Sequence, residues 1–273
     1  MNSFKTRLLT GVAFVVAMVA GVYGHYWSFA LLFTTIGAGC LWEFYGMVLE
    51  KNTPIGHRVL DVVPGVLLIG GGFALQSGYW SFLTEVLLLR MLIALFFLFF
   101  ILELFRANEK PFGQMAWRAL GIAYIAVPFY LLPQLACSTG DYVPHRVMGL
   151  LVLVWSNDTF AYLTGSLVGK TPFFPRISPK KTWEGTLGGI ACTAILAWLA
   201  AQYFPFYSQL QWLLLAFIVG VFGTLGDLVE SMLKRSFQVK DSGHLLPGHG
   251  GLLDRFDAFI FVLPFVGLVV SGW

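Results

Sequence analysis

Residues 231–257 read SMLKRSFQVKDSGHLLPGHGGLLDRFD, and this polar stretch separates two apolar runs at 210–230 and 256–272. A bilayer core takes about 20 mostly apolar residues per helix, so both runs predict membrane-spanning helices. Similar runs precede them at 8–24, 27–49, 59–78, 82–105, 115–136, 146–168 and 185–204. The pattern predicts an all-α integral membrane protein with about nine transmembrane helices.

The composition supports this class. Only 11% of the residues are charged, 58% are hydrophobic, and the mean hydropathy is +0.77. Soluble domains have about 25% charged residues, so this chain is too poor in charge to cover a water-facing surface. The net charge of +3 is too small to indicate a nucleic-acid partner. Cys40, Cys137 and Cys192 lie far apart in apolar runs, which matches neither a disulfide framework nor a zinc site.

The basic residues indicate the orientation. Of the 17 Lys and Arg residues, 15 lie at the N-terminus or in alternate connections between runs. The exceptions are Arg146, in an opposite-side connection, and Arg90, inside the fourth run. By the positive-inside rule the N-terminus is cytoplasmic, the C-terminus lies on the opposite side, and 231–257 faces the cytoplasm. Lys5 and Arg7 precede an apolar run without a small-residue cleavage site, so we expect an uncleaved first helix.

The chain shows no soluble domain, long linker or internal repeat. We therefore expect a single polytopic membrane domain over residues 1–273. Within it, residues 1–140 form N-terminal helices, and residues 146–273 form the helices and cytoplasmic loops that carry the chemistry.

Acidic residues mark the two helix ends that flank the polar stretch. Asp227 and Glu230 share one helix face at i, i+3 spacing, and Asp254 and Asp257 repeat that spacing at the start of the last run. Ionisable groups within membrane spans cost about 2.5–3.5 kcal/mol and usually mark function. A salt bridge from Glu230 to Lys234 explains that residue equally well, and first-turn aspartates also serve as helix caps. Carboxylates that face one cytoplasmic pocket nevertheless form an oxygen-ligand set suited to Mg²⁺.

Two neighbouring segments complete the candidate site. The glycine-rich PGHGG turn at 247–251 lets an anion approach backbone N–H groups and a helix N-terminus. The segment RISPKKTWEG at 176–185 offers hydroxyl and ammonium donors, although composition alone favours an ordinary basic loop that touches lipid headgroups. Asp158, within a span, either lines the same cavity or bonds to a neighbouring helix, and the sequence leaves both open.

The 231–257 stretch resembles the signature of the phosphatidate cytidylyltransferases, also called CDP-diacylglycerol synthases. SPKKTWEG and WSNDTFAYLTG resemble other recurrent segments of that family, and the resemblance covers the chain from about Trp155 onward. Every fixed position of the signature is met, by Ser231, Leu233, Lys234, Arg235, Lys240, Asp241, Gly243, Leu246, Pro247, His249, Gly250, Gly251, Asp254, Arg255 and Asp257.

The resemblance implies the reaction of CTP with phosphatidic acid to give CDP-diacylglycerol and pyrophosphate. It further implies a homodimer. With the charge pattern, we expect a protein of the cell (inner or plasma) membrane whose active site faces the cytoplasm, and the low net charge predicts no nucleic-acid partner. The short N-terminus fits a bacterial form. The competing hypotheses are a related membrane CTP-dependent lipid kinase and, less favoured, an ion-coupled transporter.

The resemblance and the charge pattern together predict the roles of individual residues. Asp227, Asp254 and Asp257 are expected to bind Mg²⁺, alone or with a second cation. Lys234 and Lys240 join these three aspartates as catalytic residues. The predicted substrate-binding residues are Ser178, Lys180, Lys181, Arg235, Asp241, His249, Gly250, Gly251 and Arg255.

Overall fold

Within the described residues, each apolar run that the sequence predicts lies largely in helical structure. The structure, a computed structural model, describes residues 3–49, 54–77, 82–106, 110–137, 140–248 and 250–270. Its helices are α1 (Ser3–Gly24), α2 (Tyr26–Val48), α3 (Ile55–Gln76), α4 (Phe82–Arg106), α5 (Pro111–Gly121), α6 (Val127–Ala136), α7 (Pro144–Val168), α8 (Trp183–Tyr203), α9 (Gln209–Ile218), α10 (Thr224–Ser236) and α11 (Leu253–Val270).

Seven helical segments within the described ranges are long and apolar enough to cross a membrane. They are α1, α2, α3, the continuous stretch 111–136, α7, α8 and the continuous stretch 209–236. Neither α4 nor α11 belongs to this set, and α11 carries Asp254, Arg255 and Asp257 within its 18 residues. The prediction of a helical membrane protein is confirmed, whereas the count of nine spans and the sides of the two termini stay predictions.

Two local features depart from a plain bundle of α-helices. Short π-helical turns, η1 (Ile122–Ala126) and η2 (Val219–Gly223), interrupt the stretches 111–136 and 209–236. The connection between α7 and α8 contains two antiparallel strands, β1 (Pro172–Phe174) and β2 (Ser178–Thr182). The basic segment around Lys180 is therefore a β-hairpin arm instead of an irregular loop, and this fixes the directions of its side chains.

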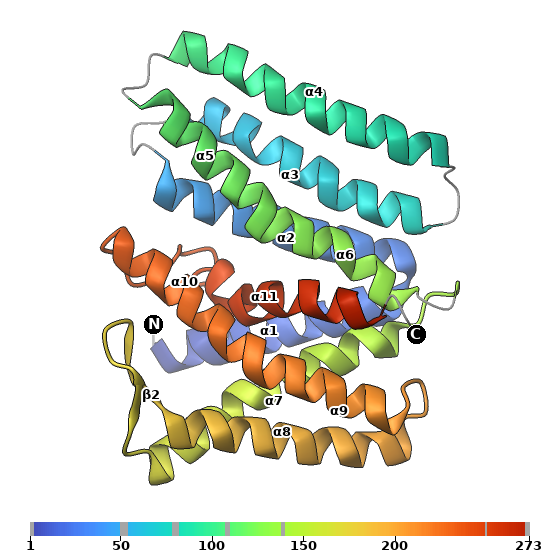
Figure 1. Ribbon diagram of the computed structural model, residues 1–273, viewed down its shortest axis with the longest axis vertical. Helices are drawn as coiled ribbons and strands as arrows, with labels where there is room; N and C mark the ends of the chain where they lie inside the picture. Colours follow the sequence, from blue (N-terminus) through green and yellow to red (C-terminus); the bar gives the residue numbers. More distant parts are fainter. Residues whose placement is uncertain are drawn as a thin grey trace. The chain divides into compact units, whose positions relative to one another are not determined.

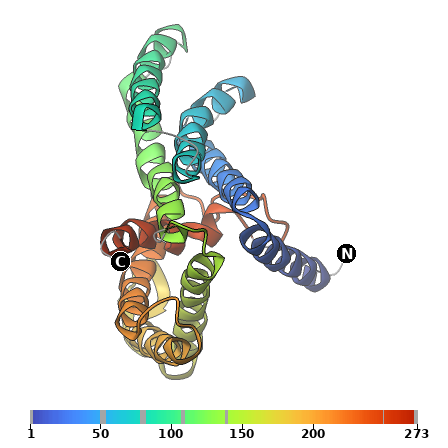
Figure 2. The ribbon, with the colours of Figure 1, turned by 90° about the vertical axis from the view of Figure 1, so that its right-hand side faces the viewer.

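The chain forms two compact units, which we describe separately. The first unit comprises Met1–Gln134 and Asp241–Leu253, and the second comprises Leu135–Lys240 and Asp254–Trp273. In the first unit, α2 packs against α1 and α3 (Figure 2). The core there is rich in aromatic side chains such as Phe29, Phe33 and Phe73, which are almost completely buried.

A buried ion network also joins three helices of the first unit. Arg118 of α5 lies 2.9 Å from Asp61 of α3 and 2.9 Å from Glu103 of α4. Arg106 contributes a second guanidinium 2.8 Å from Asp61. Two arginines thus face two carboxylates, so the network is formally neutral and the charges compensate one another away from water.

In the second unit α8 packs against both α7 and α9, and the β-hairpin lies at one end of the α7–α8 pair (Figure 1). Small residues let α7 and α8 approach closely. A Cβ on Gly189 would lie 2.8 Å from Ala161 Cβ, and one on Gly185 would lie 2.9 Å from Gly165 Cα. Thr164 Oγ1 also donates across the interface to Gly185 O, at 3.1 Å. Small residues at i, i+4 are a common means of close helix packing in membranes, and here they set the spacing on which the neighbouring site depends.

Candidate active site

A polar cavity of about 560 Å³ lies in the second unit, among α7, β2, α8, α10 and α11. Its charged lining consists of four acidic and four basic side chains: Asp158, Asp227, Asp254, Asp257, Lys180, Lys181, Lys234 and Arg255. Hydroxyl and amide groups of Asn157, Thr182, Thr186 and Thr224 also line it. This concentration of charge within apolar helices is costly unless it binds something, so the cavity is the candidate active site.

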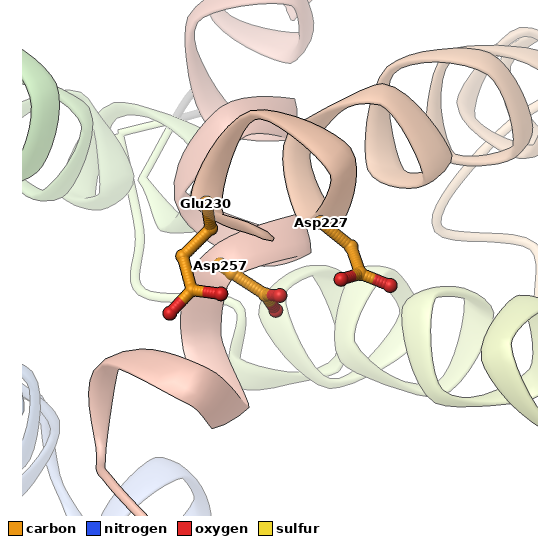
Figure 3. A group of neighbouring side chains, drawn as sticks. All are labelled: Asp227, Glu230 and Asp257. Atoms are coloured by element: carbon orange, nitrogen blue, oxygen red, sulfur yellow. The ribbon is translucent and has the colours of Figure 1, made fainter. Parts of the chain in front are cut away.

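Three carboxylates converge beside this cavity. Asp227 and Glu230 come from α10 and Asp257 comes from α11, as Figure 3 shows. One oxygen atom from each lies within 4.8 Å of the other two. Glu230 is fully buried and Asp257 is 8% exposed. Glu230 Oε1 has no hydrogen-bond partner among the described residues, so this group has the acceptor capacity and the oxygen chemistry that fit a divalent cation.

Two lysines neutralise part of this negative charge. Lys181 of β2 forms an ion pair with Asp227, and Lys234 forms one with Glu230. Lys234 Nζ also lies 2.6 Å from Asp254 Oδ1, so it bridges α10 and α11. Three carboxylates with two ammonium groups leave an excess of negative charge, which is what a cation site requires.

The local structure of α10 explains why its carboxylates face α11. The π-turn η2 ends directly before Thr224, and Thr224 Oγ1 donates to Gly220 O at 2.8 Å, within that turn. Gly226 has no side chain where α11 approaches: a Cβ there would lie 3.2 Å from Asp257 O and closer still to Phe261. Single π-turns within α-helices often occur at functional sites, and this one precedes Asp227 by one helical turn.

The β-hairpin is held in place by Glu184, the second residue of α8. Its carboxylate accepts from Thr171 Oγ1 at 2.8 Å and from the N–H groups of Lys170 and Thr171 at 3.1 Å. Thr182 caps α8 by accepting from Gly185 N at 3.2 Å. These contacts fasten both ends of the hairpin to α8, and they thereby place Lys180 and Lys181 at the cavity.

The structure brings together about half of the predicted site residues. Asp227, Asp254, Asp257, Lys180, Lys181, Lys234 and Arg255 line the cavity. Ser178, Arg235 and Lys240 do not line it, and Arg235 Nη1 instead donates to Val239 O at 3.2 Å. Asp241, Gly250 and Gly251 belong to the first unit, and His249 lies outside the described residues.

The predicted Mg²⁺ set of Asp227, Asp254 and Asp257 stays a prediction. The three carboxylates with oxygens within 4.8 Å of one another are Asp227, Glu230 and Asp257, and Lys234 contacts both Glu230 and Asp254. The salt bridge from Glu230 to Lys234, one of the two explanations left open for that residue, is present as well. Glu230 is completely buried beside Asp257 of α11, and i, i+3 spacing does not reveal which face of α10 meets α11.

Polar residues that sequence reasoning passed over also reach the cavity. Asn157 Nδ2 lies 3.5 Å from Thr224 Oγ1, which links α7 to α10. Both are polar residues within long apolar helices, and this was the signal that could have identified them. Asp158, whose place was left open, lines the cavity.

Comparison with known proteins identifies the family. The model of the cytidylyltransferase family matches residues 5–272. A Bacillus subtilis protein named phosphatidate cytidylyltransferase is 37% identical, over 99% of each chain. A Staphylococcus aureus protein of the same name is 39% identical, over 76% of this chain and 79% of its own. Since both the family model and the Bacillus subtilis relative span almost the whole chain, this protein belongs to the cytidylyltransferase family.

Proposed function

We propose that this protein transfers the cytidylyl group of CTP to phosphatidic acid, which gives CDP-diacylglycerol and pyrophosphate. The observation that carries the proposal is a charged cavity among membrane helices, in a chain whose relatives are named for this reaction. The protein is a nucleotidyltransferase of phospholipid biosynthesis. It is a multi-pass membrane protein with bacterial relatives.

The reaction mainly requires that the negative charge of the two substrates is neutralised and that their reacting atoms are aligned. A phosphate oxygen of phosphatidic acid attacks the α-phosphorus of CTP, and the bond from that phosphorus to the bridging oxygen of pyrophosphate breaks. The attacking oxygen is already anionic at neutral pH, so no strong general base is needed. The protein must hold two anions together and stabilise the leaving pyrophosphate.

The cavity supports a need for metal. Its lining has four acidic and four basic side chains, and Glu230 beside it adds a fifth carboxylate, so side chains alone supply no net positive charge for a triphosphate and a lipid phosphate. Asp227, Glu230 and Asp257 would hold Mg²⁺, and Asp254 remains a further candidate ligand. Bound there, Mg²⁺ would neutralise phosphate charge and act as a Lewis acid.

The basic residues around the carboxylates would bind the phosphates. Lys180 and Lys181 on the hairpin and Arg255 on α11 line the cavity and can donate to phosphate oxygens. Lys234 keeps Glu230 and Asp254 in place and carries the charge that the buried Glu230 requires. Tyr162 lines the cavity and is 75% exposed, which supports entry of the lipid substrate from the side.

Membrane orientation and assembly complete the proposal. Lys181 meets Asp227, and Lys234 meets Asp254. Strand β2 and the start of α11 therefore both lie beside α10, which supports placing the two charged connections on one membrane side. With the positive-inside rule, we propose nine spans in one polytopic domain, a cytoplasmic N-terminus and active site, and a C-terminus on the opposite side. We also propose a homodimer in the cell membrane.

The direct test supplies purified protein with labelled CTP, phosphatidic acid in mixed micelles, and Mg²⁺. We expect CDP-diacylglycerol and pyrophosphate in equal amounts. Release of CDP together with a newly phosphorylated lipid would indicate a lipid kinase and would refute the proposal.

A further inference from the structure

Glu43 of α2 is a buried carboxylate in the first unit, and no role in the reaction has yet been assigned to it. It is 4% exposed. Within the described ranges no basic side chain lies within salt-bridge distance of it. An ionisable group in such surroundings costs free energy unless other donors satisfy it.

Among the residues that the structure describes, its hydrogen-bond donors come from one segment about 200 residues further along the chain, which we call the signature loop (241–253). Oε2 accepts from Ser242 Oγ at 3.0 Å and from Leu253 N at 2.9 Å, and Oε1 accepts from Leu245 N at 3.4 Å. A single carboxylate therefore ties the beginning, the middle and the end of the loop to α2. Leu253 N is thereby satisfied at the end of the loop, where a buried N–H without a partner would cost free energy.

Two glycines of the loop are explained by the same carboxylate. A Cβ on Gly243 would lie 2.5 Å from Glu43 Cδ and 2.7 Å from Cγ. A Cβ on Gly251 would lie 2.5 Å from Glu43 Oε2, 2.8 Å from Gly243 N and closer still to Ser242 Oγ. Gly243 therefore leaves room for Glu43, and Gly251 leaves room for Glu43 together with the Ser242 hydroxyl that donates to it. Sequence reasoning assigned the glycines of the PGHGG turn to the approach of an anionic substrate, whereas protein atoms fill the space beside the Cα of Gly251.

The loop also packs on the same face of α2 through its leucines. A Cβ on Gly39, one helical turn before Glu43, would lie 3.6 Å from Leu245 Cδ1. The turn itself has a defined conformation, with Leu246 N donating to Gly250 O at 3.1 Å and positive φ angles at Gly248 and Gly250. Glu43 therefore makes the polar contacts between α2 and the signature loop, while leucine side chains make the apolar ones.

We propose that Glu43 is a positioning residue for cytidylyl transfer, because it holds the signature loop in the conformation that receives CTP. This inference rests on the proposed function, since Asp241, His249, Gly250 and Gly251 of that loop are its predicted substrate-binding residues. Glu43 acts through the loop and does not contact substrate.

The first test is Glu43→Gln in the full-length protein. Glutamine keeps the size of the side chain but has only one acceptor oxygen, so its NH2 group faces at least one of the loop's donors. We expect amide hydrogen exchange in peptides covering 241–253 to become about 10-fold faster or more, and the KM for CTP to rise by about 10-fold, with a smaller change in kcat. Asp141→Asn, which removes one negative charge at an exposed position of the second unit, is the matched control and should change neither quantity.

A second pair of variants gives a result even if Glu43→Gln fails to fold. The three heavy atoms closest to a Cβ on Gly243 all belong to the Glu43 side chain. Gly243→Ala should therefore raise the KM for CTP about 10-fold in the wild type, but less than 2-fold when added to Glu43→Ala, because the second change removes the obstruction.

Unchanged loop exchange and an unchanged KM in folded Glu43→Gln would overturn the inference, and so would additive effects of Gly243→Ala and Glu43→Ala. These outcomes are separate from a failure of the proposed function. If the wild type forms no CDP-diacylglycerol, the proposed function is refuted. Hydrogen exchange of the signature loop in Glu43→Gln would still measure whether Glu43 keeps that loop ordered.

Discussion

Asp257→Asn should make the protein more stable in the absence of divalent cations and insensitive to their addition. Asp257 shares its site with Asp227 and Glu230, with one oxygen of each within 4.8 Å. At that distance and an effective dielectric constant of 20, each pair of like charges repels by about 3.5 kcal/mol. Lys181 and Lys234 offset part of this repulsion, so we expect a net stabilisation on the order of 1–3 kcal/mol, or about 2–4 °C in Tm per kcal/mol.

The same substitution should abolish stabilisation by metal. Mg²⁺ at a 100-fold excess over its Kd stabilises a wild-type site by about 2.7 kcal/mol, which corresponds to several degrees. The asparagine variant lacks one anionic ligand and the excess negative charge. We therefore expect its Tm to stay constant as Mg²⁺ is added.

Thermal unfolding can be followed with a maleimide dye, because Cys40 and Cys137 are buried and become reactive when the chain unfolds. The titration compares MgCl2 with choline chloride at matched ionic strength, so that general screening is subtracted. Asp141→Asn again serves as the control, and it should keep the wild-type response to Mg²⁺. Two results would refute the reasoning about the carboxylate group. One is a Tm of Asp257→Asn below that of the wild type without metal, and the other is a rise in the Tm of Asp257→Asn with Mg²⁺ as large as the rise in the wild type.

Three other outcomes follow from the same contacts. Lys234→Met should destabilise the protein by about 3–5 kcal/mol, because it leaves Glu230 buried without a counter-charge. Adding Glu230→Gln should recover much of the lost Tm, and additive losses from the two substitutions would contradict this coupling. Asp254→Asn should abolish turnover while the protein stays folded, as judged by gel filtration and Tm, and near-normal turnover would remove Asp254 from the catalytic set. Gly189→Ala should lower Tm by an amount corresponding to about 1–3 kcal/mol, because the new methyl group would meet Ala161 across the α7–α8 contact. An unchanged Tm would show that these helices can separate at no cost in free energy.

Much of the fold could be predicted from the positions and lengths of the apolar runs. In lipid, backbone N–H and C=O groups must be satisfied within the segment, so a long apolar run has few alternatives to a helix, and α2, α3, α7 and α8 begin and end close to the predicted positions. The hairpin around Lys180 was not predicted, because its two short strands are stabilised by Glu184 of α8 and not by a pattern of their own.

The candidate site was predictable only in part. Asp227, Asp257 and Lys234 stood out because charges are rare in this chain, and the structure places all three at the cavity. The place of Glu230 beside Asp227 and Asp257 could not be predicted, because it depends on which face of α10 meets α11. Gly226 and the π-turn before Thr224 determine that face, and a π-turn leaves no periodic mark in a run of apolar residues.

Hydropathy and the signature residues are local properties of the chain, so they were enough to identify a helical membrane protein of the cytidylyltransferase family. Which charges meet is a property of the folded protein. Lys181 reaches Asp227, and Glu43 reaches Ser242 and Leu253, across separations of 46, 199 and 210 residues. Such contacts depend on how helices pack and on where a glycine permits close approach, and neither is encoded in the spacing of residues within one segment.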